Sequence, residues 1–271
     1  MSTAFSTIQA SSDAGVLTIT LNRPESLNAY NGQMSVELAA VLKTAQREDA
    51  VRCVVLTGAG KGFCSGQDLA EIKDRYTANP DGPPATIDFD SHLRQKFNPI
   101  VTRIRTLEKP VIAAVNGVAA GAGASFAFAC DLRLCARSAA FAMAFTSIGL
   151  VPDSAACLTL LQHVGYARAT EMLFLGEKLP AETALAWGLV NRVYDDAELT
   201  EKTREMATKL ANMPTKALGL TKRLLSGAWT SSLDQQLETE AFLQHTAGNT
   251  ADHREGVLAF LEKRRPKFVG K

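Results

Sequence analysis

The chain has 271 residues and a nearly balanced charge, with 29 Lys and Arg against 28 Asp and Glu. Because the net charge is only +1, no global field favours nucleic acid or an anionic membrane, so an acidic ligand must be recognised locally. The length allows one large α/β domain, or a core of about 200 residues with an appendage.

Cysteine usage and the N-terminus indicate the compartment. The five cysteines are odd in number and lack metal-ligand spacing: Cys53, Cys64, Cys130, Cys135 and Cys157. This pattern favours reduced thiols over a disulfide framework and predicts no metal site. The N-terminus has no basic region followed by an apolar core, and no run approaches the ~18 apolar residues of a membrane span. We therefore expect a soluble cytoplasmic protein.

The first predicted elements alternate between strand and helix. Residues 15–21 (GVLTITL) alternate apolar with small or polar side chains and end at Asn-Arg-Pro, which predicts a strand. Residues 31–47 have apolar side chains at helical spacing, with Asn31 placed as the cap. A buried strand at 51–57 then enters a glycine-rich loop at 58–66. Strand, helix and strand in this order predict a right-handed crossover between parallel strands.

Further along the chain, a short helix is predicted to start near Gln67, and residues 75–90 are predicted to form a mobile surface excursion rich in Pro, Asp and Gly. Periodicity then predicts a helix at 91–107 and strands at 111–115, 132–136, around 141 and at 189–194. The remaining chain is expected to be helical. These patterns predict an α/β core over residues 1–195 and a helical region over residues 196–271.

Two glycine-rich loops, residues 58–62 and 117–123, resemble phosphate-binding loops only in composition. The first has Lys61 without the spacing and the following Ser or Thr of a P-loop, and the second has Phe126 where the dinucleotide fingerprint requires glycine. A serine nucleophile elbow at Ser125 also fails, because the glycine required two residues later is replaced by alanine. Nucleotide binding and serine hydrolysis are therefore disfavoured.

The segment 111–125, VIAAVNGVAAGAGAS, begins as an apolar strand, breaks at Asn116-Gly117 and continues into an Ala/Gly-rich helix. A strand that turns through glycine into a helix leaves N–H groups without partners at the helix start, which is a candidate anion site. Each glycine loop could supply one N–H donor of an oxyanion hole, in which a single donor is worth ~3–4 kcal/mol. Tight turns alone also account for these glycines, so the residues by themselves leave both interpretations open.

Five motifs resemble, in order and spacing, the enoyl-CoA hydratase/isomerase (crotonase) superfamily: LNRPESLNAYN, LTGAGKGFCSGQDL, KPVIAAVNGVAAGAGAS, FAMAFTSIGLVPDS and EGVLAFLEKRRPKF. The resemblance runs from about residue 15 to the C-terminus. It implies an α/β fold with a crotonase (ClpP-like) β-β-α spiral core, and a helical C-terminal region that assembles homotrimers or dimers of trimers. FCSGQDL, GLVPDS and NGVAAGAGA are most similar to the phenylacetate-degradation branch, which isomerises a ring-1,2-epoxide of phenylacetyl-CoA and shifts double bonds in related enoyl-CoAs.

The resemblance assigns an oxyanion hole to the two glycine loops. The thioester oxygen would bind the backbone N–H of Gln67 and that of Ala122, with Gly121 and Gly123 allowing the thioester to approach closely. Binding this oxygen stabilises an enolate, so a proton α or γ to the carbonyl becomes removable. A base is then required.

The same resemblance identifies the base. Hydratases of the family use two glutamates, whose positions here are Ser125 and Phe145, which argues against ordinary water addition. The remaining carboxylate is Asp153, at the position of the acid in the family's single-acid isomerases. A lone acid can remove a proton at one carbon and return it at another, which is all that a 1,3 or 1,5 double-bond shift requires. Its apolar neighbours are expected to raise its pKa by desolvation.

Two features near Asp153 leave alternatives open. Pro-Asp-Ser before a helix is also an ordinary N-cap, and one loop could serve both purposes. After Asp-Ser the family branch continues with two glycines and a threonine, whereas this chain has Ala155, Ala156 and Cys157. The added methyl groups are expected to alter the acyl pocket, so the acyl group stays open.

For the CoA moiety, the resemblance implies contacts from two segments: Ser26, Leu27 and Ala29, and Ser65, Gly66, Gln67, Asp68 and Leu69. Arg23 is expected near the phosphates, and Lys61 on the solvated surface. Lys267-Phe268 resembles a site that closes over the nucleotide, sometimes that of a neighbouring subunit. Coenzyme A belongs to the substrate, so no separate cofactor is expected.

These expectations combine into an acyl-CoA isomerase, with two rivals. One rival is an enoyl-CoA hydratase (lyase) in which other groups hold the water, Ser125 being the only polar remnant. The other is a non-catalytic acyl-CoA-binding protein in which the altered SAAC segment closes the site.

Overall fold

The computed structural model describes residues 5–77 and 87–271. Most of the surface excursion predicted at 75–90 lies outside the described residues. Within them, ten strands form two sheets. The larger sheet has the order β1-β2-β3-β5-β7-β10 and contains β1 (Ile8–Asp13), β2 (Val16–Leu21), β3 (Cys53–Gly58), β5 (Val111–Val115), β7 (Leu132–Ala136) and β10 (Arg192–Tyr194). Neighbouring strands within this sheet are parallel, except for the antiparallel pair β1–β2.

The smaller sheet has the order β4-β6-β8-β9 and contains β4 (Gly62–Cys64), β6 (Val118–Ala120), β8 (Ala140–Ala142) and β9 (Lys178–Pro180). The strands come in consecutive pairs, of which the first strand lies in the larger sheet and the second in the smaller sheet: β3 and β4, β5 and β6, and β7 and β8. A helix follows each pair along the chain. This threefold β-β-α repeat is the predicted spiral.

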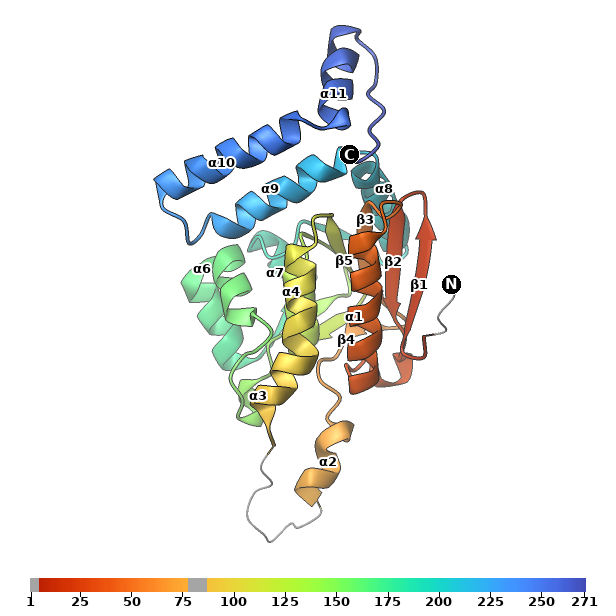
Figure 1. Ribbon diagram of the computed structural model, residues 1–271. Helices are drawn as coiled ribbons and strands as arrows, with labels where there is room; N and C mark the ends of the chain where they lie inside the picture. Colours follow the sequence, from red (N-terminus) through yellow and green to blue (C-terminus); the bar gives the residue numbers. More distant parts are fainter. Residues whose placement is uncertain (1–4, 78–86) are drawn as a thin grey trace.

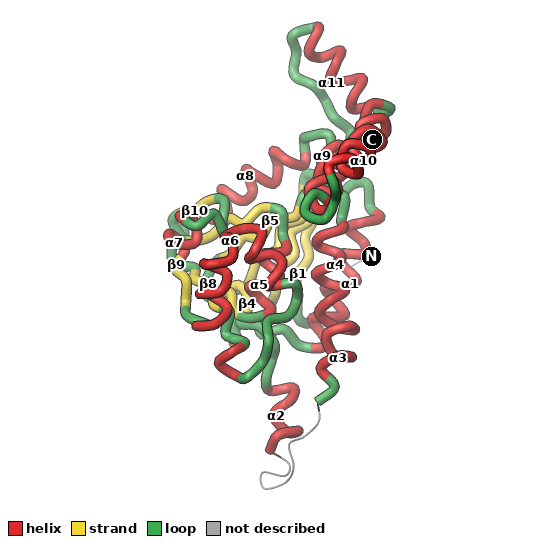
Figure 2. The backbone as a smooth tube through the Cα atoms, turned by 90° about the vertical axis from the view of Figure 1, so that its left-hand side faces the viewer, coloured by secondary structure: helices red, strands yellow, loops and turns green. Residues whose placement is uncertain are grey.

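The core helices are α1 (Gly32–Arg47), α2 (Ala70–Thr77), α3 (Phe89–His92), α4 (Asn98–Thr106), α5 (Ala122–Ala129), α6 (Ala156–Leu175) and α7 (Ala181–Ala186). Figure 2 places α1 and α4 on one side of the strands and α8 (Leu199–Ala211) on the other. The eight residues of α5 are all buried, because its sequence AGASFAFA has no face for water. This burial fixes the start of α5 against both sheets.

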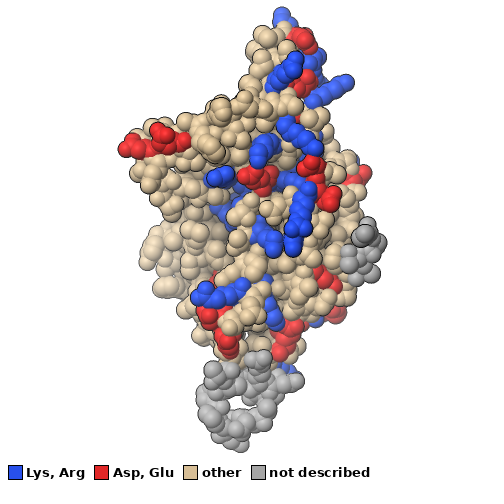
Figure 3. Space-filling view, viewed as in Figure 1, with Lys and Arg blue, Asp and Glu red and all other residues tan. Residues whose placement is uncertain are grey.

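The C-terminal helices α9 (Thr215–Gly227), α10 (Leu233–Gly248) and α11 (Ala251–Leu261) extend away from the core (Figure 1). They leave large apolar side chains exposed, for example Phe242 at 62% and Phe260 at 83%. On the face in Figure 3, Lys and Arg are interspersed with Asp and Glu, as the near-zero net charge predicts. No helix in the described part of the chain is long and apolar enough to span a membrane.

Local sequence signals account for most of these elements. Asn31 caps α1, its Oδ1 accepting a hydrogen bond from the N–H of Met34 at 2.9 Å, as predicted. The helix predicted at 91–107 starts earlier, at Phe89, and passes through a π turn at Leu93–Phe97 before α4. The five cysteines are free, as expected, and only Cys157 is exposed.

Four strands escaped prediction and one helix start was wrong. Strand β1 (IQASSD) lies at the sheet edge with five of its six residues exposed, so it lacks apolar alternation. Strands β4, β6 and β9 have three residues each, too few for a period. The helix expected near Gln67 begins at Ala70, because Gln67 is held in an isolated parallel bridge with Tyr30.

Candidate active site

The two glycine loops meet at the start of α5. A Cβ on Gly66 would lie 2.9 Å from the carbonyl oxygen of Ala120 and 3.7 Å from the backbone nitrogen of Ala122. Gly66 also has a φ of +95° and Gly121 a φ of +49°, a region that residues with a side chain rarely adopt. The close approach and the backbone conformation therefore both require glycine, and they bring Gln67 beside Ala122.

Tyr30 sets the orientation of the Gln67 peptide. The N–H of Tyr30 donates to Gly66 O at 2.7 Å, and Tyr30 O accepts from the N–H of Asp68 at 2.9 Å. In such a parallel bridge the residue between the two bonded groups directs its own N–H and C=O away from the partner. The Gln67 N–H therefore points away from Tyr30.

Ala122 is the first residue of α5, and its N-cap, Gly121, provides no side-chain hydrogen bond. The first N–H groups of a helix have no intrahelical acceptor, so the Ala122 amide is available at this end. A Cβ on Gly123 would lie 2.3 Å from Cys64 O, so Gly123 allows α5 to pack directly on β4. The structure thus brings Gln67, Gly121 and Ala122 together and places Gly123 at a packing contact.

Asp153 lies directly before α6, and its carboxylate does not cap that helix. The N-cap of α6 is Ala155, without a side-chain hydrogen bond, and Asp153 contributes only its backbone oxygen, which accepts from the N–H of Ala156 at 2.9 Å. The Asp153 side chain instead accepts a hydrogen bond from the Ser154 hydroxyl at 2.8 Å. Desolvation by burial raises its pKa, as expected, and the Ser154 hydrogen bond opposes this rise.

The two positions assigned to hydratase glutamates are buried and carry no carboxylate. Ser125 is fully buried, and its hydroxyl donates to Gly121 O at 3.1 Å and lies 3.5 Å from the backbone oxygen of Asp153. Phe145 is 7% exposed, and its Cζ lies 3.9 Å from where a Gly121 Cβ would stand. Ser125 therefore connects the start of α5 to the Asp153 loop, while Phe145 presents an apolar ring.

An apolar cavity of about 420 Å³ adjoins Gln67 and is lined by Gln67, Leu69, Ile72, Lys73, Phe89, Ile148 and Leu150. The Gln67 side-chain nitrogen lies 3.2 Å from His92 Nε2, and the His92 ring packs against Phe97 with centroids 5.3 Å apart. Sequence reasoning missed His92, because no motif links it to Gln67, 25 residues earlier.

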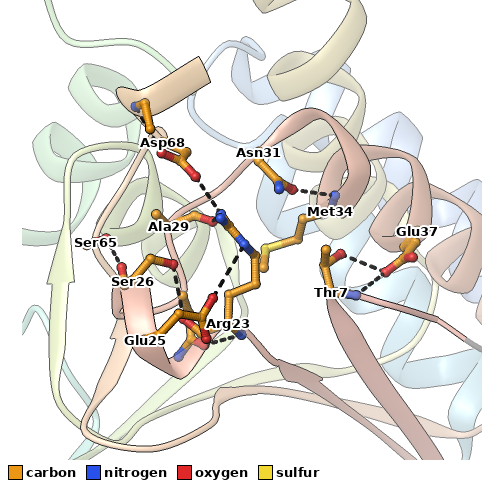
Figure 4. A network of polar contacts seen from close by, with 12 residues as sticks. Thr7, Arg23, Glu25, Ser26, Ala29, Asn31, Met34, Glu37, Ser65 and Asp68 are labelled. Carbon is orange, nitrogen blue, oxygen red and sulfur yellow. Dashed lines mark hydrogen bonds and ion pairs between the residues drawn. The ribbon is translucent and has the colours of Figure 1, made fainter. Parts of the chain in front are cut away.

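The segments predicted to bind CoA are joined by the polar network in Figure 4. Arg23 Nη1 forms an ion pair with Asp68 Oδ2 at 2.7 Å and donates to Ala29 O at 2.6 Å. The Ser65 hydroxyl donates to Ser26 O at 3.0 Å (Figure 4).

The apolar members of these segments are open to solvent beside this network. Leu27 is 41% and Leu69 49% exposed, so both can contact a ligand. Lys61 is exposed, as expected.

Lys267 and Phe268 are not brought to these segments within one chain. The Lys267 N–H donates to Glu255 on α11 at 2.7 Å, and Phe268 O accepts from Arg52 at 2.8 Å. Helix α11 lies at the opposite end of the molecule from α2, which follows Leu69 (Figure 1). Among the residues that the structure describes, no cluster of His, Cys, Asp and Glu could hold a metal ion.

Comparison with known proteins gives consistent matches over nearly the whole chain. The family model for enoyl-CoA hydratase/isomerase matches residues 11–271. The 1,2-epoxyphenylacetyl-CoA isomerase of Escherichia coli is 48% identical over 259 residues, which cover 96% of this chain and 97% of that protein. The short-chain-enoyl-CoA hydratase of Clostridium acetobutylicum is 33% identical over 92% of each chain. A crystal structure of an enoyl-CoA hydratase from Bacillus anthracis superimposes with a TM-score of 0.89 at 31% identity, covering 98% of this chain and 100% of that one.

Proposed function

Because the chain belongs to the enoyl-CoA hydratase/isomerase (crotonase) family, we propose that it is an acyl-CoA isomerase with Asp153 as its single acid–base group. One observation carries the proposal: Asp153 is tied through Ser125 to the turn that bears Ala122, whereas the two glutamate positions hold Ser125 and Phe145. The site thus has one carboxylate where ordinary hydration requires two.

With an enoyl-CoA substrate, the proposed reaction moves one proton between two carbons of the acyl group. The N–H groups of Gln67 and Ala122 bind the thioester oxygen and stabilise the enolate that forms when Asp153 removes a proton from the α or γ carbon. The protonated Asp153 then returns this proton to the other carbon, and the double bond shifts. No water, metal or separate cofactor enters the balance. A pKa raised by burial suits a group that must both accept and return a proton near neutral pH.

In this proposal the CoA moiety lies along the two cross-linked segments that contain Leu27 and Leu69, and the acyl group enters the cavity beside Gln67. The name of the E. coli relative supports a 1,2-epoxide of phenylacetyl-CoA as one substrate. Enoyl-CoAs whose double bond can shift are the other candidates, because a single acid–base group suffices for that shift. Ala155 and Ala156 stand where the phenylacetate-degradation branch has glycines, and their methyl groups are expected to alter the pocket. The acyl group that the pocket accepts is therefore determined by the substrate panel below.

The proposal includes self-association as a homotrimer or dimer of trimers. The many large apolar side chains exposed on α10 and α11 support it, since exposed apolar surface is characteristic of protein interfaces. Lys267 and Phe268 would then close over the nucleotide of a neighbouring subunit, because they are remote from Leu69 within their own chain.

The test is a substrate panel with product analysis. Enoyl-CoAs of different chain length and the phenylacetyl-CoA ring epoxide are incubated with the wild type and with Asp153→Asn. Isomerised products that form with the wild type but not with Asp153→Asn support the proposal. Robust hydration of crotonyl-CoA that survives Asp153→Asn would instead support the hydratase rival, and binding of CoA thioesters without proton exchange would support the non-catalytic rival.

A further inference from the structure

The residue after Asp153 has an unusual backbone conformation. Ser154 has a φ of +52° and Ala155 a φ of +62°, so two consecutive residues with side chains occupy the left-handed region. Ser154 is only 4% exposed, which excludes solvation as the reason for a polar side chain there. The turn directs its hydroxyl back to Asp153.

The contact defines which carboxylate oxygen is engaged. Ser154 Oγ lies 2.8 Å from Asp153 Oδ1, and because an ionised carboxylate can only accept, the hydroxyl is the donor. On the main chain, Asp153 O accepts from Ala156 N–H at 2.9 Å and faces the Ser125 hydroxyl at 3.5 Å. Among the described residues, Ser154 is the side chain that hydrogen-bonds this carboxylate. No described protein group hydrogen-bonds Oδ2, so Oδ2 is the carboxylate oxygen that remains free to accept a proton.

The surroundings of Asp153 provide little other polarity. Helix α5 (AGASFAFA) and residues 143–152 (MAFTSIGLVP) contain no ionisable side chain, and the first turn of α6 has only the exposed Cys157. Lys73 and His92 belong to the elements around the cavity that adjoins Gln67. Burial raises the Asp153 pKa, and the Ser154 hydroxyl is the neighbouring group that lowers it.

We propose that Ser154 is a positioning residue for the acid–base chemistry of Asp153: its hydroxyl holds Oδ1, so that Oδ2 is the oxygen that takes and returns the substrate proton. The inference rests on the proposed function, because it assigns a task within that reaction. It also explains the left-handed turn, since a right-handed Ser154 would carry its hydroxyl elsewhere.

The test compares Ser154→Ala with the matched control Ser35→Ala. Ser35 is another buried serine, 5% exposed, whose hydroxyl donates to Lys96 O on a different part of the fold. We expect Ser154→Ala to move the acidic limb of the pH–rate profile upward by about one pH unit, the size expected for loss of a hydrogen bond to a charged group. The control should leave the limb in place. Ser154→Gly, which removes the hydroxyl and relieves the positive φ, must behave like Ser154→Ala and serves if that variant folds poorly.

A second readout separates this inference from the proposed function. The Asp153 carboxyl carbon, ¹³C-labelled and assigned by its absence from Asp153→Asn, reports its pKa directly without any substrate. A higher Asp153 pKa in both Ser154 variants supports the predicted hydrogen bond to the ionised carboxylate even if the substrate panel fails, in which case the failure lies with the proposed function. An unchanged carboxyl titration and an unchanged acidic limb in both variants would overturn it, whether or not the enzyme isomerises acyl-CoAs.

Discussion

The contact between the two glycine loops makes Gly66 the most sensitive backbone position in the proposed oxyanion hole. A Cβ there would lie 2.9 Å from Ala120 O, a backbone atom that cannot rotate away, and the residue has a φ of +95°. Replacing Gly66 with alanine must therefore shift the loop that carries the Gln67 N–H relative to Ala122.

Two effects add in Gly66→Ala. The positive φ costs ~1–2 kcal/mol of stability for a residue with a side chain. Displacing one oxyanion donor costs ~3–4 kcal/mol of transition-state stabilisation, which corresponds to a loss of ~10²–10³ in kcat. The catalytic loss should thus greatly exceed what the loss of stability alone produces.

Gly15→Ala is the matched control, because Gly15 has a φ of +82° but a Cβ there would meet its nearest neighbour at an ordinary 3.5 Å. Thermal unfolding and turnover of an accepted acyl-CoA are measured for both variants. Both should be destabilised by the positive φ, Gly66→Ala further by its backbone clash, whereas only Gly66→Ala should lose ~10²-fold or more in kcat. Comparable turnover in the two variants would refute the assignment of the Gln67 N–H to the oxyanion hole.

Three further predictions follow from named contacts. Asp153→Asn should raise the melting temperature at pH 7, because burial makes the ionised carboxylate unfavourable in the folded state and so raises the pKa of Asp153. This gain in melting temperature should vanish as the pH is lowered towards 3.8, the ordinary pKa of an aspartate, and melting curves recorded across that pH range check it. Arg23→Ala removes the ion pair with Asp68 and should increase the KM for CoA thioesters more than it lowers kcat, in steady-state kinetics. Lys222→Met removes the 2.8 Å ion pair with Asp131, whose Oδ2 keeps, among the described residues, only the hydrogen bond from Val111 N–H, and should cost ~1.5–3 kcal/mol in denaturant unfolding. No change in the midpoint would contradict a role of this ion pair in docking α9.

Local sequence signals predicted the regular elements well where they were long and periodic. Helix α1 carried both an apolar stripe and a capping Asn31, and β7 was predicted with its observed bounds. The edge strand β1 and the three-residue strand β4 carried no such signal, because an exposed edge needs no apolar face and three residues define no period.

The candidate site could be predicted only in part. The glycines indicated a close backbone approach, but that residues 66 and 121 approach each other depends on the parallel pairing of β4 with β6 in the smaller sheet. Asp153 was predicted as the acid–base group only through family resemblance, since its local sequence favoured a cap that the fold does not form. The proximity of Gln67 and His92 depends on how α3 packs beside the glycine loop, which no local pattern encodes.

The central claim is that Asp153 moves a substrate proton beside an oxyanion hole formed by Gln67 and Ala122. The most direct measurement is deuterium incorporation from heavy water into the α and γ carbons of a bound acyl-CoA, followed by mass spectrometry for the wild type and Asp153→Asn. The account predicts incorporation by the wild type and a loss of ~10²–10⁴-fold in the variant, the usual contribution of a general base. Incorporation at the wild-type rate in Asp153→Asn would contradict it.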